Sequence, residues 1–160
     1  MYDFAPLPGQ PKPELYAELA DAAAALIAGE PDRVANMANL AALVWQFVPQ
    51  LNWAGFYRDI EGELVLGPFI GKPACIRIAF GQGVCGAAAA TGETQLVADV
   101  QAFPGHIACD AASRSELVVP VMRGDVLVAV IDLDSPEPAR FDAEDAAGIE
   151  LLARTIAAAI

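Results

Sequence analysis

Basic residues are few in this sequence: nine Lys and Arg stand against 21 Asp and Glu, which gives a formal net charge of −12. Such a surface repels nucleic-acid phosphates and anionic lipid headgroups, so we expect neither nucleic-acid binding nor membrane-surface binding. Long apolar runs are also missing, since charged or turn residues interrupt every apolar stretch before the roughly 20 residues that a spanning helix needs. The start, MYDFAPLPGQPKPEL, does not resemble a secretory signal. We therefore expect one soluble, cytoplasmic domain over residues 1–160.

Cysteine and histidine are scarce, with three cysteines and a single histidine in 160 residues. An odd cysteine count in a reducing compartment argues against a structural disulfide framework and for free, catalytic or metal-bound thiols. The alternative is that each cysteine is a small apolar filler of the core. One short stretch, FPGHIACD at 103–110, nevertheless gathers His106, Cys109 and Asp110.

The spacing of apolar residues predicts four helices and six strands in an α+β fold. Helical periodicity marks both ends of the chain, and β-rich runs separated by Gly, Pro, Asp or Asn fill the middle. We expect the helices from the two ends to pack on one face of a mainly antiparallel six-stranded sheet. The expected helices cover 13–28, ended by Gly29, 31–48, closed before Pro49, 83–92 and 142–156, and the expected strands cover 52–57, 63–67, 75–80, 94–100, 115–122 and 126–134.

Acidic residues stand at the ends of two expected strands. Glu116 lies at the start of one strand, and Asp132 and Asp134 alternate at the end of the last one, VLVAVIDLD. Alternation with period two puts the two aspartates on the same face. They are an ordinary pair if that face is solvated. In an apolar run, however, desolvation raises a carboxyl pKa and can keep one group protonated as an acid.

Three chemistries are open for the thiols. A hydrolase would use His106 as the base for Cys109, but these residues share one loop, whereas catalytic Cys and His more often come from separate elements; His106 would otherwise hold the loop by a hydrogen bond. Zinc could bind His106 and the three cysteines, yet no CxxC pair appears. In the third chemistry a thiolate attacks an electrophilic sulfur, and a second thiol converts the sulfenic acid to a disulfide without a bound cofactor.

Several motifs resemble those of the free methionine-(R)-sulfoxide reductases, an enzyme family built on the GAF fold. The motifs are NWAGFY, LVLGPFIGKPACIRI, GQGVCG, DVQAFPGHIACDAASRSELVVP and IDLDSP, and each cysteine falls in one of them. The resemblance runs from the second helix to the last. It implies a GAF-like fold and thiol-dependent reduction of free L-methionine-(R)-sulfoxide, with thioredoxin as the external reductant and no bound cofactor or metal. It also implies a homodimer.

The resemblance implies a role for each cysteine. Cys109 corresponds to the nucleophile that attacks the sulfoxide sulfur, releases methionine and is left as a sulfenic acid. Cys75 corresponds to the resolving thiol, which forms the disulfide that thioredoxin reduces. Cys85 is the third cysteine of the family pattern and offers a second route for disulfide exchange.

The resemblance also implies a substrate pocket. Trp53 corresponds to the aromatic wall beside the substrate methyl group, and Glu116, Asp132 and Asp134 correspond to the pocket carboxylates. One carboxylate would protonate or hydrogen-bond the sulfoxide oxygen, which leaves as water only when protonated, and another would hold the ammonium group of the free amino acid. The rival interpretation is a GAF module that senses a small ligand without turning it over, because a fold alone does not determine function.

Overall fold

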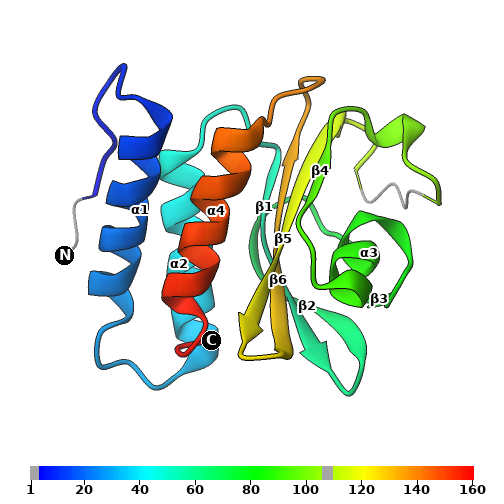
Figure 1. Cartoon of the computed structure of the whole chain (residues 1–160), viewed down its shortest axis with the longest axis horizontal. Helices are drawn as coiled ribbons and strands as arrows, with labels where there is room; N and C mark the ends of the chain where they lie inside the picture. Colours follow the sequence, from blue (N-terminus) through cyan, green and yellow to red (C-terminus); the bar gives the residue numbers. More distant parts are fainter. Residues whose placement is uncertain (1–3, 106–109) are drawn as a thin grey trace.

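Residues 4–105 and 110–160 are described by the structure, a computed structural model. One antiparallel sheet of six strands, in the order β3-β2-β1-β6-β5-β4, forms the centre of the molecule. Figure 1 shows α1, α2 and α4 on one side of the sheet and α3 on the other. The predicted α+β class, with helices from both chain ends on one face, is confirmed. The elements are α1 (Lys12–Ile27), α2 (Arg33–Phe47), β1 (Trp53–Ile60), β2 (Glu63–Gly71), β3 (Arg77–Ala79), α3 (Gly83–Thr91), β4 (Gln95–Val97), η1 (Val100–Ala102), β5 (Ser115–Arg123), β6 (Val126–Ser135) and α4 (Ala143–Ile156).

The first and last helices are fastened together by a buried polar contact. The Tyr16 hydroxyl of α1 donates a 2.6 Å hydrogen bond to Asp145, which also completes the capping box of α4 with Asp142. A capping box satisfies backbone N–H groups that a helix start leaves without partners. Close approach is possible because residue 148 is glycine, where a Cβ atom would overlap the Tyr16 ring. These contacts join the two ends of the chain into one layer.

The two faces of the sheet differ in what covers them. Along β6, Ile131 and Leu133 point into the core under α1, α2 and α4, whereas Val130 belongs to the smaller core under α3. Asp132 and Asp134 follow Val130 at the same period of two, so they lie on the α3 face. The predicted common face of the two aspartates is therefore confirmed.

Two expected strands are shorter than predicted. The 75–80 run contributes only β3, so Cys75 lies in the loop before the strand and not at its start, because its carbonyl accepts a hydrogen bond from the Tyr57 hydroxyl at 3.0 Å. The 94–100 run contributes only β4, because the Asp99 side chain accepts from the N–H of Gln101 and starts the short helix η1. Side-chain bonds of this kind compete with a strand ladder. No helix in the described ranges is long and apolar enough to cross a membrane.

Candidate active site

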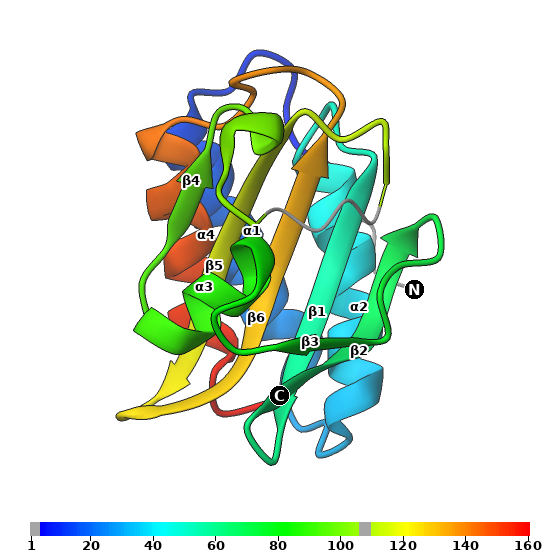
Figure 2. The ribbon, with the colours of Figure 1, turned by 90° about the vertical axis from the view of Figure 1, so that its right-hand side faces the viewer.

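Three adjacent strands bring the predicted acidic and aromatic residues together. Asp134 on β6 stands opposite Trp53 on β1 and opposite Glu116 on β5. Neighbouring residues in such a register have Cβ atoms about 4.5–5.5 Å apart. Figure 2 shows the face on which they lie, with α3 in front of β6. Residues separated by up to 81 positions therefore meet because the strand order places β6 between β1 and β5.

A cleft lies between this sheet face and α3. It has two adjoining parts of about 400 and 250 Å³, open mouths included, and Tyr57, Asp110, Asp132 and Asp134 line both. The larger part also contacts Cys85, Ser113 and Glu116. The smaller part adds Trp53 and the segment of residues 72–74.

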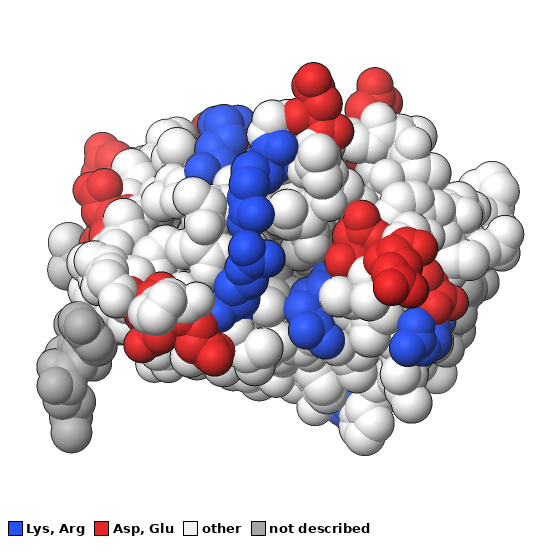
Figure 3. All heavy atoms as spheres, turned by 90° about the horizontal axis from the view of Figure 1, so that it is seen from below, with Lys and Arg blue, Asp and Glu red and all other residues white. Residues whose placement is uncertain are grey.

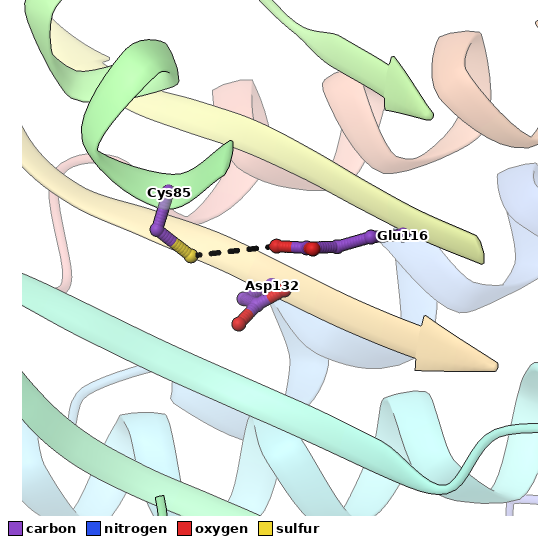
Figure 4. A group of neighbouring side chains, drawn as sticks. All are labelled: Cys85, Glu116 and Asp132. Carbon is purple, nitrogen blue, oxygen red and sulfur yellow. Dashed lines mark hydrogen bonds between the residues drawn. The ribbon is translucent and has the colours of Figure 1, made fainter. Parts of the chain in front are cut away.

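The floor of the larger part is a compact group of two carboxyl groups and a thiol. Cys85 from α3, Glu116 from β5 and Asp132 from β6 point toward one another (Figure 4), and the Cys85 thiol lies 3.9 Å from Glu116 Oε1 as a hydrogen-bond donor. One oxygen of Asp132, which is only 6% exposed, has no hydrogen-bond partner among the described residues. Ligand atoms of the three residues lie within 4.8 Å of one another, close enough to hold a metal ion.

Cations are absent from this floor within the described part of the chain, where no Lys or Arg is ion-paired with Glu116 or Asp132. On the face seen in Figure 3, Lys and Arg side chains form a stripe. Arg33 and Arg58 line a groove with Val126 at the start of β6, whereas the aspartates lie at the end of that strand. A buried carboxylate without a partner is costly, so the cleft favours a proton or a cationic ligand.

Burial raises the pKa of every acidic group at this floor. Desolvation, followed by the charges of neighbouring carboxylates, raises the pKa of Glu116 and Asp132 well above their ordinary values. The same two causes raise the pKa of the Cys85 thiol, which disfavours its thiolate. Desolvation raises the pKa of Asp134 to about 7, although a hydrogen bond from Ser113 opposes part of the increase. Asp134 therefore exchanges a proton near neutral pH.

Aromatic residues form the β1 side of the cleft and hold the loop that carries Cys75. The Trp53 ring stacks on Phe69 at 5.1 Å and on Tyr57 at 5.9 Å between ring centres. The Trp53 indole N–H donates to the carbonyl of Lys72 at 3.2 Å, and the Tyr57 hydroxyl donates to that of Cys75. The residues that line the cleft thus also fix the backbone near Cys75, which is half-buried.

Asp110 connects two loops at the mouth of the cleft. It pairs with Lys72 at 3.2 Å and accepts a 3.3 Å hydrogen bond from Asn52, which also donates to Ser113. Hydrogen bonds from the N–H of Ala112 and from Lys72 lower the pKa of Asp110, so it remains a carboxylate. Lys72 and Cys75 lie on one loop, and Asp110 follows Cys109 in the sequence.

Five of the predicted site residues meet at this cleft: Trp53, Cys85, Glu116, Asp132 and Asp134. Cys75 lies on the loop beside it, whereas Cys109 and His106 lie outside the described residues. Sequence reasoning missed Tyr57, Asp110 and Ser113 as site residues. Period-two alternation from Trp53 would have found Tyr57 on the same face. No local pattern indicates Ser113, which reaches the cleft through the fold of its loop.

Known proteins similar to this chain share the fold and the length of the domain. The family model described as GAF domain matches residues 34–160. The free methionine-R-sulfoxide reductase of Escherichia coli strain K12 is 48% identical over 141 residues, which cover 88% of this chain and 86% of that protein. The enzyme of the same name from Saccharomyces cerevisiae is 46% identical, with 80% and 76% covered. The structure of free methionine-R-sulfoxide reductase from Neisseria meningitidis in complex with its substrate has a TM-score of 0.91, 42% identity, and 98% and 95% covered.

Proposed function

The chain belongs to the GAF-domain family, and from this premise we propose that it reduces free L-methionine-(R)-sulfoxide to L-methionine with its own cysteines. The single observation that carries the proposal is the buried, cation-poor group of carboxylates beside an aromatic wall. The identity with reductases over most of the chain supports the same activity. The wider GAF fold hosts other functions, so the residues of the site, and not the fold, indicate the activity.

The carboxylates select a free amino acid. Glu116 and Asp132 lack a cationic partner among the described residues, so the ammonium group of free methionine sulfoxide can supply the missing charge. A methionine inside a peptide has no such group, and its chain would have to pass through the cleft. Trp53 and Tyr57 supply an apolar surface for the substrate's methyl and methylene groups.

Asp134 acts as the acid. Its pKa of about 7 keeps a proton available at neutral pH, and it lines both parts of the cleft. A general acid works best when its pKa lies near the working pH. The thiolate bonds to the sulfoxide sulfur, and the sulfoxide oxygen takes this proton. The resulting hydroxyl group passes to the cysteine sulfur while its bond to the substrate sulfur and the new S–S bond break, so methionine leaves reduced and the cysteine is oxidised to a sulfenic acid.

Cys109 performs the attack and Cys75 resolves the product. The Cys75 thiol attacks the sulfenic sulfur, water departs, and a Cys75–Cys109 disulfide remains. The position of Cys75 on a loop joined to Asp110 by Lys72 supports this pairing. A dithiol protein of the thioredoxin class then restores both thiols. Cys85, whose raised pKa keeps it protonated, lines the floor and is at most a second route of exchange.

The test is a single turnover without external reductant. Fully reduced protein is mixed with each diastereomer of free methionine sulfoxide, and released methionine and lost thiols are counted per chain. We expect about one methionine and about two lost thiols, with the R form only. Cys109→Ser should release none, whereas Cys75→Ser should release methionine and leave a sulfenic acid that dimedone traps. If neither diastereomer yields methionine from the wild-type protein, the chain is a ligand-binding module.

A further inference from the structure

The loop before β3 exposes an apolar side chain next to a functional cysteine. Ile76 is 70% exposed, more than any other large apolar residue in the described ranges. It directly follows Cys75, and β3 is an edge strand of the sheet. Single exposed apolar residues are common on protein surfaces, so exposure by itself carries no function. Ile76 differs from the other exposed apolar residues because it lies beside Cys75.

The exposed side chain is held in place by its backbone. The carbonyl of Ile76 accepts a 2.9 Å hydrogen bond from the N–H of Leu66 on β2, and the preceding carbonyl, of Cys75, is bound by Tyr57. The segment is therefore anchored to the sheet on both sides of the side chain. A preorganised apolar contact loses less conformational entropy on binding than a mobile one.

The basic residues closest to Ile76 in the sequence are both engaged in ion pairs. The two neighbouring cations each have a carboxylate partner: Arg77 pairs with Glu63 at 2.7 Å, and Lys72 pairs with Asp110 at 3.2 Å. The net charge of the whole chain is −12. An exposed apolar side chain beside paired charges offers a partner a contact that does not require an opposite net charge on that partner.

We propose that Ile76 and the segment of residues 72–77 form the docking surface for the thioredoxin-class dithiol protein, an inference that rests on the proposed function. Docking there aims one thiolate of the partner at the Cys75 sulfur of the Cys75–Cys109 disulfide. The Cys75–Cys109 bond breaks, a mixed disulfide with Cys75 forms, and Cys109 leaves as a thiolate. The partner's second thiol then attacks the partner's first sulfur in this mixed disulfide and releases Cys75 as a thiol. Two electrons have passed to the enzyme, and the partner is left with a disulfide.

The experiment compares two reductants on two matched variants. Ile76→Glu places a charge in the proposed docking surface. Leu96→Glu places a charge at the opposite edge of the sheet, on β4, where Leu96 is 45% exposed. Turnover is measured with thioredoxin at varied concentration and, separately, with dithiothreitol. Burial of one isoleucine side chain corresponds to about a tenfold effect or more, so Ile76→Glu should lower kcat/KM for thioredoxin by at least about that factor. Ile76→Ala should give a smaller decrease in the same direction.

The controls separate this inference from the function itself. Single-turnover methionine release and dithiothreitol-driven turnover should stay within about twofold of wild type in all three variants, since a small thiol needs no docking surface. Equal losses with both reductants would overturn the inference, because Ile76 would then act on Cys75 within the enzyme. An unchanged thioredoxin kcat/KM, or a change in oligomeric mass with Ile76→Glu, would overturn it as well. Absence of methionine release from wild-type protein would refute the proposed function instead.

Discussion

Within three consecutive residues, the two faces of β6 differ: one packs into the apolar core and the other carries the carboxyl groups of the cleft. Leu133 is fully buried in an apolar core closed by α1, α2 and α4. Its neighbours Asp132 and Asp134 point to the other face, where α3 leaves a cleft and no described cation pairs with Asp132. The same strand thus supplies apolar packing on one side and carboxyl groups that are costly to ionise on the other. Apolar packing stabilises the domain enough to tolerate the cost of the acidic cleft.

Asp134→Asn should have the largest effect of the variants that distinguish the two faces, because it should lower activity without lowering stability. An amide keeps the size of the side chain but cannot donate an acidic proton, so kcat/KM for methionine sulfoxide should fall by about 10²–10⁴-fold. The thermal midpoint should stay the same or increase. Steady-state kinetics and calorimetry measure both, with Asp125→Asn in the β5-β6 turn as a matched control. Near-normal activity in Asp134→Asn would assign the acid role to another carboxylate.

Leu133→Ala should lower stability and leave activity nearly unchanged. Removing a fully buried leucine from the packed core costs about 2–5 kcal/mol of unfolding free energy. Urea denaturation measures this loss, and activity per folded molecule should remain within a few-fold of wild type. The division between the faces breaks down if Leu133→Ala loses activity as severely as Asp134→Asn while the protein remains folded.

The pH dependence of stability should report the titration of Asp134 on the cleft face. The pKa of Asp134 is about 7 when folded and near its ordinary value of 3.8 when unfolded, so the folded state binds the extra proton between these limits. The free energy of unfolding should therefore decrease as pH rises from about 4 to about 7, by about 1.4 kcal/mol for each unit of pKa difference. Asp134→Asn should flatten this slope in denaturation measured across that range. An equally steep slope in the variant would contradict the assignment.

Cys85→Ala should have the smallest effect. Its raised pKa keeps the thiol protonated, so it is a poor nucleophile despite lying at the floor of the cleft. Thioredoxin-linked turnover should fall by less than about tenfold, compared with near-complete loss in Cys75→Ser. Loss of thiols in a single turnover distinguishes the two, since Cys85→Ala should still lose about two per chain. A loss of only one thiol would make Cys85 the resolving residue.

Much of the fold was predictable because its signals are local. The switch from helical to alternating periodicity placed the four helices and six strands, and alternation alone put Asp132 and Asp134 on one face. The predictions were wrong where a side chain competes with the strand ladder, at Cys75 and at Asp99. Those hydrogen bonds depend on Tyr57, 18 residues before Cys75, and on the turn that Asp99 begins.

The sequence by itself determined the fold class, the residue types of the site and their motif neighbours, since periodicity, caps and turn residues act within a few positions. Only the tertiary structure decided that Asp134 lies between Trp53 and Glu116, that Tyr57 and Lys72 hold the loops at the cleft, and that Ile76 is exposed beside Cys75. These relations depend on strand order and on burial by distant residues. The pKa of Asp134 follows from them, because desolvation is produced by the whole fold around a carboxyl group.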